Sequence, residues 1–198
     1  MKALVIIDMQ NDFIPGGSLA VTEGETIIPI INKLQEKFQL VIATQDWHPK
    51  DHSSFAENNN GKKEFENIQI NGIDQTLWPV HCVQNTFGAE LHADLNTVKF
   101  EAIFRKGTNK EIDSYSAFFD NAHLKSTGLS GYLKDKGVTS LYFCGLAADY
   151  CVYYSIMDSL KQGFKSYLFE DATKAISEEK YEEVKKEILH AGGKIITT

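Results

Sequence analysis

The 198 residues of this chain carry a formal charge of −7, with 24% charged and 42% hydrophobic residues. This length suits one domain, expected to cover 1-198, with a core large enough to fold without disulfides or a metal. The acidic balance excludes a general nucleic-acid-binding protein, because no basic excess is available to neutralise phosphates. No apolar run approaches the roughly 20 residues that a membrane span needs, so we expect neither nucleic acid nor a membrane as a partner.

The cysteines and the N-terminus indicate a cytoplasmic protein. Cys82, Cys144 and Cys151 are odd in number and irregularly spaced, which fits reduced thiols better than a disulfide framework. The apolar run at residues 3–7 is too short for the core of a signal peptide, and no small-residue cleavage site follows it.

The first half of the chain predicts two buried strands and a helix. Residues 3–7 and 40–44 are apolar runs rich in β-branched residues, typical of strands buried on both faces. Residues 26–38 repeat their apolar positions at helical spacing. An excursion follows at about 47–97, and it is too long for an idle connection, so we expect it to have a function or to be disordered.

The second half alternates strands and helices. Strands are predicted at 98–104, 140–144, 166–169 and 194–197, and helices at 129–136, 151–162 and 178–190. Gly137 is the expected C-terminal cap of the first of these helices, and Ser177 the N-cap of the last. This order predicts an α/β fold of three layers, α/β/α and Rossmann-like, with a mostly parallel sheet of about six strands. In such folds, sites form beyond the carboxyl ends of the strands.

Four reactive side chains stand at, or just past, predicted strand ends: Asp8, Asp46, Lys106 and Cys151. Polar residues naturally begin where buried strands end, so any one of them alone means little. A thiol, an amine and two carboxylates at one edge of the sheet favour chemistry instead.

Cys151 opens the predicted helix 151–162. A helix N-terminus favours negative charge, which lowers the pKa of a thiol, and its free N–H groups can stabilise an oxyanion. We therefore interpret Cys151 as a nucleophile, and Cys144 and Cys82 as small core residues.

Asp8 and Lys106 can supply what a thiolate needs to cleave an amide. Asp8 can shuttle the proton to the leaving ammonia, and Lys106 can stabilise the anion. Spacing alone is equally compatible with a buried ion pair of purely structural use.

A candidate metal group lies at the start of the excursion and within it. Asp46, His48 and His81 would suit Zn²⁺ or another divalent first-row metal. Spacing alone favours the alternative, in which the two histidines are loop residues that never meet. His52 is open as an extra ligand, a residue that orients a ligand, or a surface residue.

Six ordered segments carry a resemblance to a known family: 3–13, 45–49, 77–84, 105–107, 113–118 and 145–152. In them the chain resembles the isochorismatase-like cysteine hydrolases over nearly its whole length. Trp-Pro-Val-His-Cys at 78–82 points to the nicotinamidase branch. The chain departs from the family's usual pattern at Ala148, where threonine is more frequent, and at Asn85, where glycine is common.

The resemblance implies a site and a reaction. It makes Asp8, Lys106 and Cys151 the catalytic triad, and it places one divalent metal ion, zinc with iron or manganese as alternatives, on Asp46, His48 and His81. It implies a cis peptide between Leu146 and Ala147 and an oxyanion hole formed by the N–H groups of Ala147 and Cys151. The implied substrate pocket is lined by Phe13, Leu19, Trp78, Tyr115, Leu146, Ala147 and Tyr150.

The implied activity is hydrolysis of nicotinamide to nicotinate and ammonia in NAD salvage, through a cysteine thioester. Aromatic walls suit a flat pyridine ring. The alternatives are a related amidase acting on pyrazinamide, an N-carbamoyl amine or another small amide, and a non-catalytic protein that binds a metal or nicotinamide. A homo-oligomer is compatible with the sequence.

Overall fold

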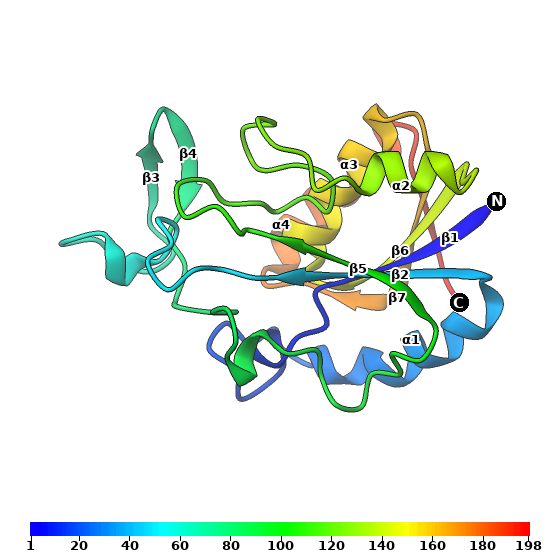
Figure 1. Cartoon of the computed structure of the whole chain (residues 1–198), viewed down its shortest axis with the longest axis horizontal. Helices are drawn as coiled ribbons and strands as arrows, with labels where there is room; N and C mark the ends of the chain where they lie inside the picture. Colours follow the sequence, from blue (N-terminus) through cyan, green and yellow to red (C-terminus); the bar gives the residue numbers. More distant parts are fainter.

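The computed structural model describes all 198 residues and contains a central sheet of six parallel strands (Figure 1). The strand order is β5-β2-β1-β6-β7-β8. The strands of this sheet are β1 (Lys2–Ile7), β2 (Leu40–Asp46), β5 (Phe100–Lys106), β6 (Ser140–Leu146), β7 (Lys165–Lys174) and β8 (Lys194–Ile196). The predicted α/β class with a mostly parallel sheet of about six strands is confirmed.

Helices cover both faces of the sheet. They are α1 (Ile28–Leu34), α2 (Leu129–Asp135), α3 (Tyr153–Lys161) and α4 (Glu178–His190). The helices α2, α3 and α4 share one apolar cluster with the sheet, and α1 belongs to a second cluster on the other face. No helix is both long and apolar enough to cross a membrane.

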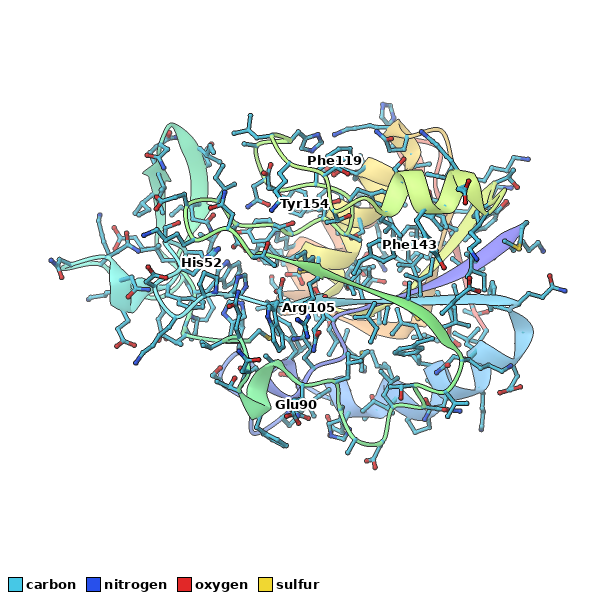
Figure 2. All side chains as sticks on the ribbon, viewed as in Figure 1. His52, Glu90, Arg105, Phe119, Phe143 and Tyr154 are labelled. Atoms are coloured by element: carbon cyan, nitrogen blue, oxygen red, sulfur yellow. The ribbon has the colours of Figure 1, made fainter.

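The alternation of side chains along β1 builds both clusters. Val5 and Ile7 pack in the first cluster and Leu4 and Ile6 in the second, each at most 1% exposed. Phe143 of β6, fully buried, lies between the sheet and the helices of the first cluster (Figure 2). In a strand buried on both faces, polar and apolar residues do not alternate, because every side chain is buried. An uninterrupted apolar run in the sequence therefore predicted these strands.

The predicted helix at 26–38 is α-helical only over α1. The 3₁₀ turns Gly24–Ile27 and Gln35–Lys37 flank it, and proline stands in its first turn, where a missing N–H costs nothing. Helix α4 begins as expected, since the Ser177 side chain accepts a hydrogen bond from the backbone N–H of Lys180.

Two strands differ from their predicted bounds. The strand predicted at 98–104 begins and ends two residues later, as β5, after a turn closed by Phe100 N–H and Thr97 C=O. The strand predicted at 166–169 continues as β7 to Lys174, because Thr173 and Lys174 pair with the end of β6.

The excursion at 47–97 contains secondary structure that its sequence did not predict. It holds an antiparallel hairpin of β3 (Asn67–Ile70) and β4 (Ile73–Thr76), and two 3₁₀ turns, Ala56–Asn58 and Phe87–Ala89. Figure 1 shows the hairpin beyond the carboxyl ends of β2 and β5, well away from the central sheet. The excursion therefore lies at the edge where the candidate site was expected.

Candidate functional site

Neighbouring strands bring the four predicted reactive side chains to one edge of the sheet. Asp46 and Lys106 are the last residues of β2 and β5 and lie side by side in register. Asp8 directly follows β1, which is next to β2. Cys151 follows β6, on the other side of β1. Parallel pairing of these four strands thus produces the cluster that the sequence predicted.

The Lys106 ammonium is the centre of this cluster. Its Nζ lies 2.8 Å from Asp8 Oδ2, 2.6 Å from Asp46 Oδ1 and 3.4 Å from Cys151 Sγ, and it also donates to the Ser114 carbonyl at 3.0 Å. Burial opposes the charge, but the two carboxylates raise the pKa of Lys106 well above its ordinary value. The lysine is therefore a permanent buried cation.

Asp8 is fixed from both ends of its side chain. The backbone lies in the left-handed region, with φ 46°, and Thr44 Oγ1 donates to Asp8 Oδ1 at 2.6 Å. Burial raises the pKa of Asp8, while the Lys106 ammonium lowers it in part. A carboxylate whose pKa is raised is a stronger base than an exposed one, which suits a group that accepts and returns a proton.

Cys151 does not open an α-helix, as the sequence had suggested. It lies in a π-helical turn, Ala148–Val152, between the cis peptide Leu146–Ala147 and α3. Burial raises the pKa of its thiol well above the ordinary value, and Lys106 opposes this only in part. The expectation of a lowered thiol pKa is wrong for the resting protein.

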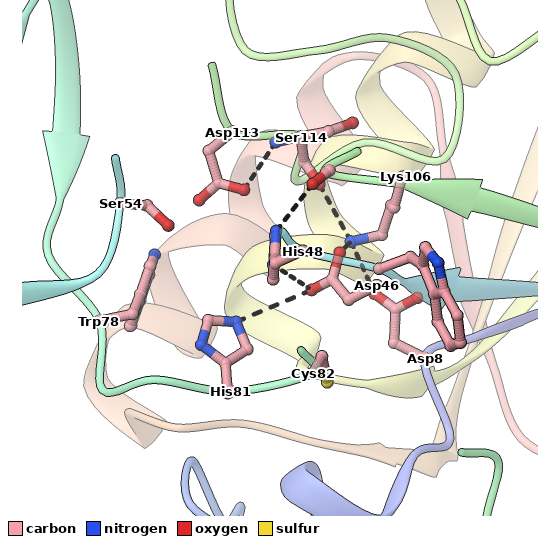
Figure 3. A network of polar contacts seen from close by, with 12 residues as sticks. Asp8, Asp46, His48, Ser54, Trp78, His81, Cys82, Lys106, Asp113 and Ser114 are labelled. Atoms are coloured by element: carbon pink, nitrogen blue, oxygen red, sulfur yellow. Dashed lines mark hydrogen bonds and ion pairs between the residues drawn. The ribbon is translucent and has the colours of Figure 1, made fainter. Parts of the chain in front are cut away.

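Asp46, His48 and His81 form a second cluster that shares Asp46 with the first. Asp46 Oδ2 lies 3.6 Å from His48 Nε2 and 4.0 Å from His81 Nε2 (Figure 3). The loop histidines do meet, which spacing alone did not favour. Their ligand atoms and the carboxylate oxygen lie within 4.8 Å of one another, close enough to share one ion.

The opposite ring nitrogens set the tautomers of both histidines. His48 Nδ1 lies 2.9 Å from the Gly107 carbonyl, and His81 Nδ1 lies 2.8 Å from the Pro79 carbonyl. A carbonyl can only accept, so each Nδ1 carries hydrogen, and in the neutral imidazole each Nε2 then directs a lone pair toward Asp46. His48 Nε2 is buried without a hydrogen-bond partner. Two lone pairs beside a carboxylate fit a cation.

The pKa shifts agree with a cation at this point. Burial, together with the nearby His48, lowers the pKa of His81 to about 4, so its lone pair is free at neutral pH. Burial also disfavours charge on His48, but the Asp46 carboxylate outweighs it and raises the pKa of His48. A proton or a divalent metal can satisfy this group, and the donor set of two imidazoles and one carboxylate is one that zinc accepts.

His52 lies beside the candidate metal group, but its ring nitrogens face residues other than Asp46. Its ring centroid is 4.4 Å from that of His48, and its Nδ1 is 2.7 Å from Ser54 Oγ. Its Nε2 is buried without a partner. The ligand atoms of His48, His52 and Asp113 lie within 4.8 Å of one another. His52 is fully buried, which excludes the surface alternative.

Next to Cys151 lies a mostly apolar cavity. Its lining consists of Phe13, Leu19, Asp46, Trp78, His81, Asp113, Tyr115, Ala147, Tyr150, Cys151 and Ile176. Six of the seven residues predicted for the substrate pocket are therefore brought together. Leu146 is the exception: it is fully buried in the second apolar cluster and does not line the cavity.

Several residues of the site had not been singled out in the sequence. Asp113 and Ile176 line the cavity. Gln10 holds the end of β2, since its Oε1 accepts from Asp46 N at 2.7 Å and its Nε2 donates to Asp46 O at 2.8 Å. Asp113 stands inside the resembling segment 113–118, so its position carried a signal. Ile176 follows the unpredicted half of β7, and nothing in the local pattern marked it.

Fold and site together define an α/β protein with a cysteine, a lysine and an aspartate at the carboxyl edge of a parallel sheet, beside a candidate metal group. A sequence profile described as the Isochorismatase domain matches residues 2–198. The chain belongs to this family. The nicotinamidase of Acinetobacter baylyi is 49% identical over 174 residues, which cover 88% of this chain and 81% of that protein.

Solved structures of nicotinamidases and pyrazinamidases are also similar to this chain. A nicotinamidase/pyrazinamidase of Acinetobacter baumanii, 47% identical, has a TM-score of 0.97 and covers 99% of this chain and 95% of its own. The yeast nicotinamidase bound to the inhibitor nicotinaldehyde, 32% identical, has a TM-score of 0.95 and covers 100% of both chains. The pyrazinamidase of Pyrococcus horikoshii in complex with zinc, 39% identical, has a TM-score of 0.83 and covers 100% and 99%.

The Gly107–His48 contact yields a test of the metal group. A Cβ at Gly107, where φ is 62°, would lie 2.3 Å from His48 Cε1. Gly107→Ala should therefore displace the imidazole and weaken zinc binding at least tenfold, measured by competition with a chromophoric chelator. Gly137→Ala is the matched control, because φ is 69° there and nothing lies within 4 Å of the added carbon. Equal zinc affinity in both variants would contradict the assignment of His48.

Proposed function

We propose that this protein is a nicotinamidase, which hydrolyses nicotinamide to nicotinate and ammonia in NAD salvage. The observation that carries the proposal is the position of the Lys106 ammonium, 2.8 Å from Asp8 Oδ2 and 3.4 Å from the sulfur of Cys151, a residue that lines the aromatic cavity. The similar proteins named nicotinamidase support it, and so does the binding of nicotinaldehyde by the yeast enzyme.

In the proposed mechanism, Asp8 is the base for Cys151. Asp8 takes the thiol proton, and Lys106 stabilises the thiolate as it attacks the amide carbon. The oxyanion is stabilised by the N–H groups of Ala147 and Cys151, and one such donor contributes about 100- to 1000-fold in rate. Because burial raises the pKa of both Asp8 and Cys151, the proton can pass between two groups that both disfavour ionisation.

The same carboxyl completes the turnover. Asp8 gives its proton to the amide nitrogen, the C–N bond breaks, and ammonia leaves a thioester on Cys151. Asp8 then takes a proton from water, whose oxygen attacks the thioester carbon. Collapse of this second adduct releases nicotinic acid, which loses its remaining proton to solvent as nicotinate, and Asp8 returns its own proton to the sulfur. Asp8 alone, accepting a proton and then donating it, is therefore sufficient for both half-reactions.

The residues proposed to hold a metal are Asp46, His48 and His81, and His52 is the candidate for a further ligand. Bound there, zinc, or iron or manganese in its place, would act as a Lewis acid that orients and polarises the substrate. Phe13, Leu19, Trp78, Tyr115, Ala147 and Tyr150 would hold the flat ring.

The wider assignments follow from the same proposal. The protein would act as one domain over 1-198, in the cytoplasm, on a small molecule. The second candidate function keeps the cysteine amidase and changes the substrate to pyrazinamide, which the names of two of the similar structures favour. Ammonia release from a panel of small amides separates the two candidates.

Replacement of the nucleophile is the first test. Cys151→Ala should reduce ammonia release from nicotinamide to background, while nicotinamide still binds, because the cavity wall is otherwise unchanged. Cys144→Ala is the control, since Cys144 is fully buried within β6. The measurement is coupled detection of ammonia, with binding followed by calorimetry. Residual turnover in Cys151→Ala well above background would show that the nucleophile is a different group.

Metal removal is the second test. Protein treated with a chelator should lose activity and recover it with one equivalent of Zn²⁺, Fe²⁺ or Mn²⁺ per chain. Zinc should also raise the melting temperature of the stripped protein, because a ligand that binds only the native state stabilises it. His48→Ala should lose this thermal shift, and His92→Ala should keep it, because His92 is partly exposed beside Asp94 and outside the candidate metal group. Full activity in metal-free protein would contradict the assignment.

A further inference from the structure

The hairpin β3–β4 contacts the cavity residues through a buried glutamine. An isolated two-stranded hairpin is marginal in water, so its position depends on contacts with the rest of the chain. Gln75 of β4 is 5% exposed, whereas Gln69 on the paired strand β3 is exposed. Figure 1 shows both strands outside the central sheet. Gln75 is therefore a buried polar group that the proposed mechanism does not use.

The Gln75 amide donates to two residues that line the cavity. Its Nε2 lies 3.1 Å from Asp113 Oδ2 and 3.1 Å from Tyr115 Oη, and also 2.7 Å from the Thr76 carbonyl. The two hydrogens of the amide nitrogen have three acceptors, so one hydrogen is shared between two of them. Exchanging the amide oxygen and nitrogen by a half-turn of the amide would be unfavourable, because the oxygen would then face the Asp113 carboxylate. The aspartate thus fixes the glutamine as a donor.

The Tyr115 oxygen accepts from two sides. In addition to Gln75, the Trp78 indole Nε1–H donates to it at 3.2 Å. A phenol oxygen has two lone pairs and one hydrogen. When both lone pairs accept, the hydrogen has to point away from both donors. Burial raises the pKa of Tyr115 well above its ordinary value, so the hydroxyl keeps its hydrogen at neutral pH.

We propose that Gln75 is a positioning residue, which directs the Tyr115 hydroxyl into the cavity as a hydrogen-bond donor to the substrate. The substrate class that this arrangement selects is a small aromatic amide with an acceptor facing Tyr115. This inference rests on the proposed amidase function and adds to it the role of the hairpin, which orients a specificity-determining donor, the Tyr115 hydroxyl, on the cavity wall.

Three variants and a control test this role. Gln75→Leu and Tyr115→Phe should each raise KM for nicotinamide about fivefold, the loss expected for one neutral hydrogen bond, with kcat within twofold of wild type. The double variant should be no worse than either single one, because both substitutions abolish the same hydrogen bond from Tyr115 to the substrate. Gln69→Leu removes an exposed glutamine, bonded to Asp74, from the same hairpin and should leave KM unchanged.

The outcomes separate a positioning role from a structural one. Additive effects on KM, or a Gln75→Leu enzyme with the wild-type KM, would overturn the proposal. If Gln75→Leu fails to fold, Tyr115→Phe still tests the proposal. An unchanged KM in that variant would show that the Tyr115 hydroxyl, which Gln75 is proposed to orient, does not bind the substrate, and this would overturn the proposal. Calorimetry with nicotinate on Cys151→Ala protein gives a readout without turnover. Absence of any binding would count against the proposed function, whereas binding that Gln75→Leu leaves unaltered counts only against this inference.

Discussion

The buried Lys106 ammonium holds the whole site together. Two carboxylates, Asp8 and Asp46, lie within 2.8 Å of it, and all three side chains are at most 6% exposed. Carboxylates this deep would be strongly destabilising if unpaired. One ammonium facing two carboxylates leaves a negative charge uncompensated when both are ionised. That charge favours a cation on the far side of Asp46, where two imidazole lone pairs converge.

Asp46 links the two halves of the site, which are the Lys106 cluster and the histidine cluster. Its Oδ1 contacts Lys106 and its Oδ2 faces His48 and His81, so the lysine cluster and the candidate metal group share one carboxylate. Gln10 bonds the backbone on both sides of the same residue, which fixes the end of β2. The cavity lies against both halves, because Cys151 and His81 both line it. A substrate bound there would contact both clusters at once.

Sequence predicted the sheet and the reactive cluster because both follow from local pattern. Apolar runs mark β1, β2 and β6, and reactive residues follow them at the edge where parallel strands end. Other features depend on contacts distant in sequence. The hairpin at 67–76 is short and polar, and the π-helical turn at Cys151 follows a cis peptide with no proline to mark it. Asn85, where the family commonly has glycine, has φ 62°, a backbone that asparagine tolerates and most residues do not.

The most direct test of this account is the kcat of Lys106→Met for nicotinamide at neutral pH, in protein shown to be folded by circular dichroism. Methionine keeps the length of the side chain and removes the ammonium that faces Cys151 and both carboxylates. The account predicts a fall of about a thousandfold, the upper range for loss of one preorganised electrostatic contact. A kcat within tenfold of wild type would contradict the central role of the lysine.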